Sequence, residues 1–471
     1  MNDRKKQPQH LLIGWSSTSI TPDKPVQLHG QHYERVSEYV RDPVTATVLA
    51  FETVADDGAI EQAIMVSCDL VNMPREVVEE LRGCVAPRLT GFDARKLFLN
   101  ATHTHTGPTM MEGLYPPARE GVMKPAEYAK FFISQIADAI VAAWESRKLG
   151  GISWALGHAA VGFNRRVVYD DGTAKMYGTS DTEHFMGVEG TNDHGVEILF
   201  TWDAAGEMTG VMINLACPSQ VVEGQYYVSA DFWAAVRDNL REIFSGNPFV
   251  YPMVSAAGDQ SPRDLVRRGR GEVNMRDDTG LEEMGRRISN AVEYAYRTAR
   301  SEPVTEVVFE HHIEELSLPM RRATVAEAEE AQRGYDELMA KAPVDPYSLD
   351  GGWLRRYQAV VERYAQQGDD PRYSMALHVI RLGEIAIAVN PFELYLDYGL
   401  RMKARSKAHQ TFVVQLCDDR GKYLPTRKAV AHGHYGGMIY DNTVGPEGGE
   451  LLVERTVNLI NAMWAEDSQD E

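Results

Sequence analysis

One stretch of the sequence predicts both a strand of the fold and a candidate site: Lys96-Leu97-Phe98-Leu99-Asn100-Ala101-Thr102-His103-Thr104-His105-Thr106-Gly107-Pro108. The apolar run at its start predicts a strand that leads directly into the two histidines. Because side chains alternate along an extended strand, His103 and His105 are expected to project to the same side, near the strand end that Gly107-Pro108 imposes. Two neighbouring imidazoles suit a divalent metal ion. The alternative is a pair of half-exposed histidines with satisfied hydrogen bonds.

The patterns on either side of this strand predict mixed β-sheets covered by helices. Two apolar runs flank the turn Asp56-Asp57-Gly58 and predict a hairpin over 44–68. Further hairpins are expected over 194–216 and 373–389. Apolar residues at helical spacing predict helices at 75–82, 125–146, 279–299 and 448–464. The expected fold class is therefore α/β, of the mixed α+β kind.

No internal repeat or low-complexity linker divides the chain. Residues 1–10 are expected to form a flexible N-terminus, and residues 466–471 an acidic tail. Between them, residues 11–465 are expected to form one large catalytic domain. Two charged helices within 323–370 predict a helical excursion on its surface.

Composition excludes several classes of partner. The chain has 471 residues and a net charge of −20, which argues against nucleic acid and anionic membranes. No apolar stretch is long enough for membrane insertion, and no secretory signal is visible, so a cytoplasmic location is expected. The four cysteines are too scattered for a disulfide framework or a zinc ribbon. A small-molecule substrate is the expected partner, and a homo-oligomer is compatible with the sequence.

Further motifs follow the histidines in a definite order. They are Asn164-Arg165, Ala257-Gly258-Asp259-Gln260-Ser261-Pro262, Asn390-Pro391-Phe392-Glu393, and Tyr423 followed twelve residues later by Tyr435. Together with Thr102-His103-Thr104-His105, this series resembles the catalytic domain of the neutral (non-lysosomal) ceramidases, a family of zinc-dependent amidases. The resemblance extends over about residues 12–465 and implies a domain of that fold.

The resemblance also implies roles for individual residues. His103, Glu393 and Tyr423 would be ligands of Zn²⁺, while His105, Arg165, Ser261 and Tyr435 would line the reaction centre. Zinc polarises a carbonyl and lowers the pKa of its bound water from about 16 to about 7, which makes hydroxide available at neutral pH. Ser261 could be the nucleophile or a donor that positions the water, and both roles stay open.

Each of these residues has a plainer interpretation. Asn390-Pro391-Phe392-Glu393 is also typical of a helix start, with Asn at the N-cap and Glu at the third position. Ser261-Pro262 fits an N-cap followed by a first helical proline. Tyr423 and Tyr435 could be half-buried aromatic residues, and Arg165 a surface cation.

One ligand of the family pattern is missing. The family's second metal-binding histidine follows a strand that corresponds to Ile213-Asn214-Leu215-Ala216-Cys217, and here the next residue is Pro218. If the preceding turn centres near Ala205, paired positions sum to about 410–412, which places His194 opposite Pro218. His194 is therefore the hypothesised replacement ligand. Glu223, Asp231 and Cys217 rank below it.

Three functions follow from these observations. The first is a zinc-dependent hydrolase that uses metal-activated water to cleave an amide bond of a small soluble N-acyl compound, and not ceramide. The second is an ester or lactone hydrolase with the same site, because one oxyanion site serves both reactions. The third is a non-catalytic ligand-binding protein whose metal site has degraded, which Pro218 favours.

Overall fold

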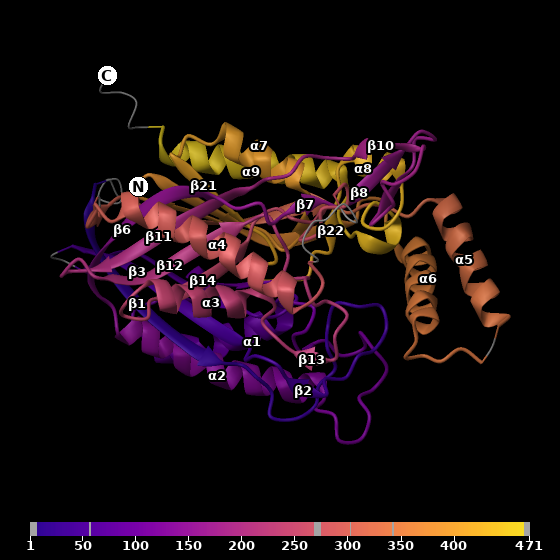
Figure 1. Cartoon of the computed structure of the whole chain (residues 1–471), viewed down its shortest axis with the longest axis horizontal. Coiled ribbons are helices and arrows are strands. Elements are labelled where there is room, and N and C mark those ends of the chain that lie inside the picture. Colours follow the sequence, from indigo (N-terminus) through magenta and orange to yellow (C-terminus); the bar gives the residue numbers. More distant parts are fainter. Residues whose placement is uncertain (1–6, 56–57, 268–274, 302, 342, 466–471) are drawn as a thin grey trace.

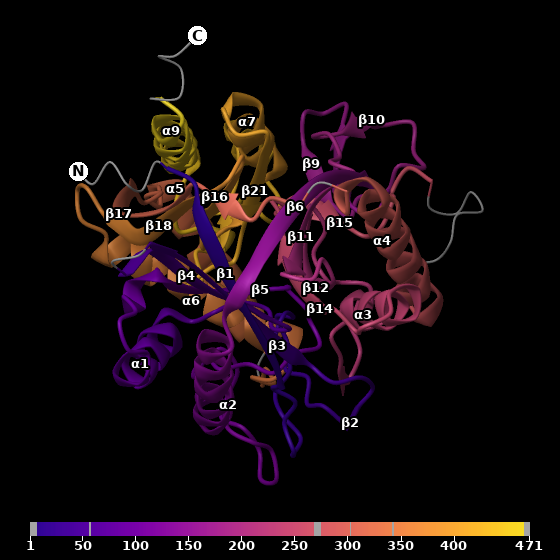
Figure 2. The ribbon, with the colours of Figure 1, turned by 90° about the vertical axis from the view of Figure 1, so that its left-hand side faces the viewer.

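Two β-sheets packed face to face form the centre of the molecule (Figures 1 and 2). The computed structural model describes residues 7–55, 58–267, 275–301, 303–341 and 343–465. The larger sheet has the strand order β14-β12-β11-β6-β1-β3-β4-β5, with β16 beside β1. Its strands are β1 (Gln9–Ser19), β3 (Thr45–Ala55), β4 (Gly58–Cys68), β5 (Leu97–Ala101), β6 (Lys148–His158), β11 (Gly195–Asp203), β12 (Met208–Leu215), β14 (Phe249–Val254) and β16 (Glu306–Val307).

The smaller sheet has the order β17-β18-β19-β21. Its strands are β17 (Phe309–Pro319), β18 (Arg372–Leu382), β19 (Ile385–Val389) and β21 (Gln410–Val414). Side chains such as Phe51, Phe98 and Tyr251 from the larger sheet meet Ile380 and Phe412 from the smaller one in a fully buried apolar layer. Burial of these large side chains is the main stabilising contribution between the sheets.

Three helix pairs cover the outer faces (Figure 2). The first pair is α1 (Arg75–Val85) and α2 (Pro125–Glu145), and the second is α3 (Phe232–Ile243) and α4 (Asp278–Ala299). The third pair, α7 (Leu396–Arg405) and α9 (Pro446–Met463), packs on the smaller sheet.

No helix in the described ranges has the length and apolarity needed to cross a bilayer. The expected mixed α/β fold, with sheets covered by helices, is confirmed.

Short strands and turns complete the chain. The small sheets are β2 (Tyr39–Val40) with β13 (Tyr227–Val228), β7 (Phe163–Asn164) with β15 (Gln260–Ser261), β8 (Arg166–Tyr169) with β9 (Ala174–Met176) and β10 (Phe185–Val188), and β20 (Glu393–Leu394) with β22 (Tyr423–Leu424). The remaining helices are η2 (Ala86–Arg88), η3 (Ala94–Lys96), α5 (Val325–Met339), α6 (Leu349–Gln366), α8 (Arg427–His432) and η4 (Ile439–Asp441).

The expected hairpins are present. β3 pairs with β4, β11 with β12 and β18 with β19, all antiparallel. Residues 56 and 57 of the expected first turn lie outside the described residues. The excursion expected within 323–370 consists of α5 and α6, which pack on each other at one end of the molecule (Figure 1).

The carboxyl ends of three parallel strand pairs meet at one edge of the two sheets. These pairs are β4 with β5, β12 with β14, and β19 with β21. Backbone bonds join the sheets there, from the Gln415 N–H to the Val254 carbonyl at 3.0 Å and from the Ala101 N–H to the Leu416 carbonyl at 3.3 Å. Loops that follow these six strands are therefore brought together, as is typical of ligand sites in α/β proteins.

Candidate active site

His103 lies in a tight turn just after β5, which ends at Ala101. Its φ of +64° falls in the left-handed region, where a non-glycine residue costs about 1 kcal/mol or more. The alternation of side chains along a strand, which the sequence predicted, therefore does not orient the two histidines. The turn after β5 sets the direction of the His103 side chain instead. Its Nδ1 donates to the Val71 carbonyl at 2.8 Å, so the lone pair of the buried ring is on Nε2.

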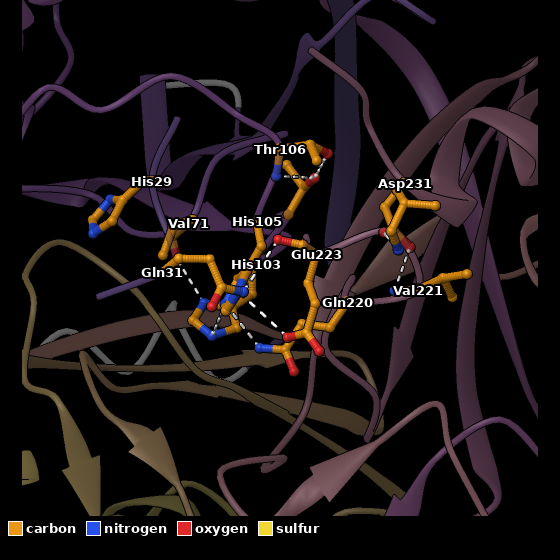
Figure 3. A network of polar contacts seen from close by, with 12 residues as sticks. His29, Gln31, Val71, His103, His105, Thr106, Gln220, Val221, Glu223 and Asp231 are labelled. Carbon is orange, nitrogen blue, oxygen red and sulfur yellow. Dashed lines mark hydrogen bonds and ion pairs between the residues drawn. The ribbon is translucent and has the colours of Figure 1, made fainter. Parts of the chain in front are cut away.

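His105 is buried beside it. Its Nε2 lies 3.5 Å from the Nε2 of His103 and accepts a hydrogen bond of 2.8 Å from the Gln220 amide (Figure 3). Its Nδ1 faces the Glu223 carboxylate at 3.7 Å. Burial and the neighbouring His103 and Arg35 hold the pKa of His105 well below its ordinary value, so the ring is neutral.

The ring of His105 packs directly on the backbone of Gly30. A Cβ at Gly30 would lie 2.4 Å from the ring Cγ, and the φ of this glycine is +111°. Both facts require glycine there. The imidazole is consequently fixed between Gly30 on one side and Gln220 on another.

Glu393 and Tyr423 face the histidines from paired short strands. Glu393 of β20 is in register with Tyr423 of β22, and the two side chains share a hydrogen bond. The Glu393 Oε2 lies 3.4 Å from the Nε2 of His103. Burial acts to raise the pKa of Glu393, but His103, Tyr423 and Arg165 outweigh it and hold this pKa below its ordinary value.

The plainer interpretation of Glu393 does not describe this segment. The Asn390 side chain accepts the Phe392 N–H at 3.1 Å in a local turn, and α7 begins only at Leu396. Glu393 is therefore part of β20 and not the third residue of a helix.

Arg165 connects the two sides of the site. Its guanidinium donates to the Gln220 side-chain oxygen at 3.1 Å, to the Tyr423 hydroxyl at 3.1 Å and to the Gly258 carbonyl at 2.9 Å. Burial acts to lower its pKa, but the tyrosines and Glu393 nearby outweigh it, so the charge is retained. Arg165 is buried and is not the surface cation of the plainer interpretation.

The fold of this chain is similar to that of two solved structures. One is the crystal structure of the neutral ceramidase of Pseudomonas aeruginosa, with a TM-score of 0.71 and 17% identity over 97% of this chain and 75% of that one. The fold is that of the neutral ceramidases. A second structure, a ceramidase complexed with C2, gives a TM-score of 0.69 and 15% identity over 98% of this chain and 76% of that one. No protein-family model and no curated protein matches the sequence.

The fold that the resemblance implied is confirmed. The hydrogen bonds of the cluster also include a residue that the sequence did not point to. Gln220 lies just after β12, two residues beyond Pro218, in the segment where the family's second histidine was expected. Its amide bridges His105 and Arg165. The only signal for it was a polar residue directly after an apolar strand, and that signal is weak.

His194 is not brought to this cluster. The β11–β12 register is as expected, since Val196 pairs with Leu215 and their numbers sum to 411. However, β12 ends at Leu215, so the pairing does not extend to Pro218. His194 instead contacts Phe163, with ring centroids 5.4 Å apart, and faces Asp193 and Asp264.

The other expected replacements are also committed elsewhere. The Cys217 thiol donates to the Val161 carbonyl at 3.1 Å. Asp231 caps α3 and accepts the Val222 N–H at 2.9 Å. Glu223 is nearer, because it faces His105, but it also pairs with Arg263 at 2.7 Å.

Tyr435 and Ser261 differ in their distance from the cluster. Tyr435 shares a side-chain hydrogen bond with Tyr423, and the two rings lie 5.4 Å apart. Ser261 belongs to β15, and its hydroxyl accepts the Arg263 N–H at 3.1 Å. No interaction in the described part of the chain joins that hydroxyl to either imidazole. Ser261 also does not begin a helix, contrary to its plainer interpretation.

The donor set fits a metal ion with three protein ligands. Among the described residues, no group of three or more His, Cys, Asp and Glu side chains could hold a metal, so any ligand set here would have to include another kind of donor. His103, Glu393 and Tyr423 supply an imidazole, a carboxylate and a phenol oxygen side by side. The bond from His103 to Val71 orients the ring as in metal sites generally.

A cavity of about 360 Å³ opens beside Glu393, Tyr423 and Tyr435. Its lining also includes Arg356 and Val360 of α6. The excursion expected on the surface is thus also a wall of this cavity. A substrate that reaches Glu393 through this space would contact α6 on the way.

Proposed function

We propose that this chain is a zinc-dependent hydrolase that cleaves an amide bond of a small N-acyl compound other than ceramide. The observation that supports it is the convergence of His103, Glu393, Tyr423 and Arg165 in a neutral-ceramidase fold, with Glu393 and Tyr423 at the wall of a cavity. A cavity of about 360 Å³ is at the small end of ligand pockets and has room for a short acyl chain.

In this proposal His103, Glu393 and Tyr423 hold the zinc ion. The metal would supply Lewis acidity to the carbonyl and make water a better nucleophile. Arg165 places a permanent positive charge beside the Glu393–Tyr423 pair, where it stabilises negative charge that develops on the carbonyl oxygen.

Proton transfer is assigned to two further residues. His105 lies beside His103 as a neutral imidazole, and it can accept the proton of the attacking water at its Nε2 in exchange for the Gln220 hydrogen bond, with its other nitrogen facing Glu223. The Tyr435 hydroxyl lies beside Tyr423 at the cavity wall and can donate to the leaving amine. Ester or lactone cleavage would use the same groups, since only the leaving atom differs.

A binding protein without catalysis is the second candidate, and Gln220 favours it. An amide occupies the segment where the resemblance implies a histidine, and it bonds to His105 and Arg165. A scaffold that only binds would not need the three remaining donors at this spacing.

The proposal is tested by metal content and amide hydrolysis together. Protein purified without a metal-affinity tag is assayed by plasma mass spectrometry and with N-acyl amides, before and after chelation. We expect about one zinc per chain, and loss of both zinc and hydrolysis in Glu393→Gln. Glu450→Gln is the control, because Glu450 pairs with Arg401 on the outer helices. No zinc uptake and no hydrolysis of amides or esters would contradict the proposal and favour the binding protein.

A further inference from the structure

Basic side chains dominate the cavity beside the proposed metal ligands. Its lining includes Arg355, Arg356, Arg363, Arg420 and Lys422, against three carboxylates, Glu112, Glu393 and Asp441. Although the net charge of the chain is −20, positive charge is thus concentrated around this cavity. Such local charge raises the concentration of anions in a cleft.

Three of these cations are already engaged in holding the wall. Arg356 forms an ion pair with Asp441. Arg363 donates to the Asn442 carbonyl at 2.7 Å and to the Thr443 carbonyl at 3.1 Å, and Arg355 donates to the Pro346 carbonyl at 2.7 Å. These bonds fasten α6 to its surroundings, so the three arginines have structural partners.

Arg420 and Lys422 are different. In the part of the chain that the structure describes, neither side chain has a carboxylate within 4.0 Å, and no hydrogen bond from either is recorded. Burial lowers the pKa of Arg420, although Glu393 and Tyr115 act to raise it. A half-buried guanidinium without an anionic partner is costly, and an anion brought by a ligand removes that cost.

Both residues are fixed close to the proposed reaction centre. The Lys422 carbonyl accepts the Glu393 N–H at 2.9 Å, and Tyr423 follows Lys422 directly. The φ of Lys422 is +59°, a left-handed conformation that turns the chain between Arg420 and Tyr423. The two cations and Glu393 therefore line the same cavity.

We propose that the substrate carries a small anionic group, a carboxylate or a phosphate, which Arg420 and Lys422 bind while the amide lies at Glu393 and Tyr423. The remaining walls suit an acyl chain, because Leu114, Val360 and Ile439 line the same space. The substrate class is thus an N-acyl derivative of an amino acid or of an aminoalkyl phosphate. This inference rests on the proposed amide hydrolysis.

Three matched compounds test it with the zinc-loaded protein: N-hexanoylglycine, N-hexanoyl-O-phosphoethanolamine and the neutral N-hexanoylethanolamine. Release of hexanoate is measured for each. We expect kcat/KM for one anionic compound to exceed that for the neutral compound about 10- to 100-fold, the size of one charge-assisted hydrogen bond. The better of the two anions identifies carboxylate or phosphate. Equal rates for all three would overturn the inference while leaving the hydrolase intact.

The Arg420→Met variant tests whether Arg420 binds the anionic group. It should raise KM for the preferred anionic compound about 10- to 100-fold, and that for the neutral compound by much less. Arg427→Met is the matched control, since Arg427 is exposed and pairs with Glu447. Melting temperature and circular dichroism verify that each variant is folded.

Direct binding separates the two proposals. Calorimetry of N-hexanoylglycine and N-hexanoyl-O-phosphoethanolamine should show binding of one compound that Arg420→Met weakens to the same degree. If that binding depends on Arg420 but no compound is hydrolysed, the anion site stands and the proposed hydrolase fails. If anion binding is absent, or is unchanged in Arg420→Met, the inference fails.

Discussion

Two pairs of buried histidines have similar ring separations but different neighbours. The ring centroids of His103 and His105 lie 5.0 Å apart, and those of His311 and His378 lie 5.2 Å apart. The closest ring nitrogens are separated by 3.5 Å in the first pair and 3.0 Å in the second. Pair geometry alone therefore does not mark a site.

The neighbours distinguish the pairs. His311 and His378 lie on adjacent antiparallel strands, and the ring of Phe98 packs against both. Their hydrogen bonds are made within the core, to each other and from His311 to the Gln62 carbonyl at 3.2 Å. His378 also has an acid nearby, since its Nε2 lies 3.6 Å from Asp418, but that carboxylate is paired with Arg82 at 2.6 Å. The Glu393 carboxylate beside His103 instead shares a hydrogen bond with Tyr423, and both line the cavity. The comparison teaches that the groups bound to the acid beside a histidine pair distinguish the two pairs, whereas the spacing of the rings does not.

The largest expected effect is a difference in catalytic activity between a substitution in the site pair and one in the core pair. His103→Ala should reduce kcat/KM for amide hydrolysis about 10³-fold or more, because a metal ligand is lost, with little change in melting temperature. His311→Ala should leave kcat/KM of the folded protein within about twofold of the wild type. Steady-state kinetics on both variants measures this, and comparable losses in both would break the comparison.

Stability should show the reverse order. His311→Ala is expected to lower the free energy of unfolding by about 2–4 kcal/mol, because it opens a cavity beside Phe98 and removes the partner of His378. Urea unfolding at pH 7 measures the difference. An unchanged midpoint would mean that the core pair is not structural.

The core pair should also make the fold sensitive to acid. Burial lowers the pKa of His311 from 6.5 to about 3 and holds that of His378 well below 6.5. Because the unfolded state binds protons that the folded state does not, stability is full above about pH 6.5 and falls as the pH drops towards 3. Each ring contributes up to about 1.4 kcal/mol per pH unit. Unfolding at pH 7 and pH 5 should show a smaller difference in His311→Phe than in the wild type.

A smaller effect is expected from the residue that supports the site pair. Gln220→Ala should reduce kcat/KM about tenfold, because His105 and Arg165 lose the amide that both contact. Gln332→Ala is the control, since Gln332 bonds to Asp336 on the exposed face of α5. A Gln220→Ala enzyme as active as the control would remove this residue from the mechanism.

The smallest effect is expected at His194. Its contacts, with Phe163 and towards Asp193 and Asp264, lie outside the cluster. His194→Ala should therefore keep its zinc content and its activity within about twofold. Loss of one zinc per chain in this variant would show that His194 reaches the site in solution.

Much of the fold could be predicted because it depends on local patterns. Hairpin register between β11 and β12 follows from the turn, and helices such as α2 and α4 follow from apolar spacing. The parallel pairs, such as β12 with β14, could not be predicted, because no turn specifies partners so far apart in sequence.

The site was predictable where a motif named the residue and not where the tertiary structure supplied it. His103, Glu393 and Tyr423 are close together as the resemblance implied, yet their exact approach depends on turns with left-handed residues. Gln220 and Arg420 carry no motif. The roles proposed for them come from their neighbours, His105 and Arg165 for Gln220 and the cavity lining for Arg420, which only the folded chain shows.

Gly30 makes this site intolerant of missense mutation at a position that has no side chain. Glycine is the only residue without a Cβ, so every missense change in its codon adds an atom where the His105 ring already lies. Neighbouring positions can drift through conservative replacements, but this one has none. A mutational scan selected for activity should therefore find Gly30 among the least variable positions of the chain, although it has no side chain to take part in any reaction.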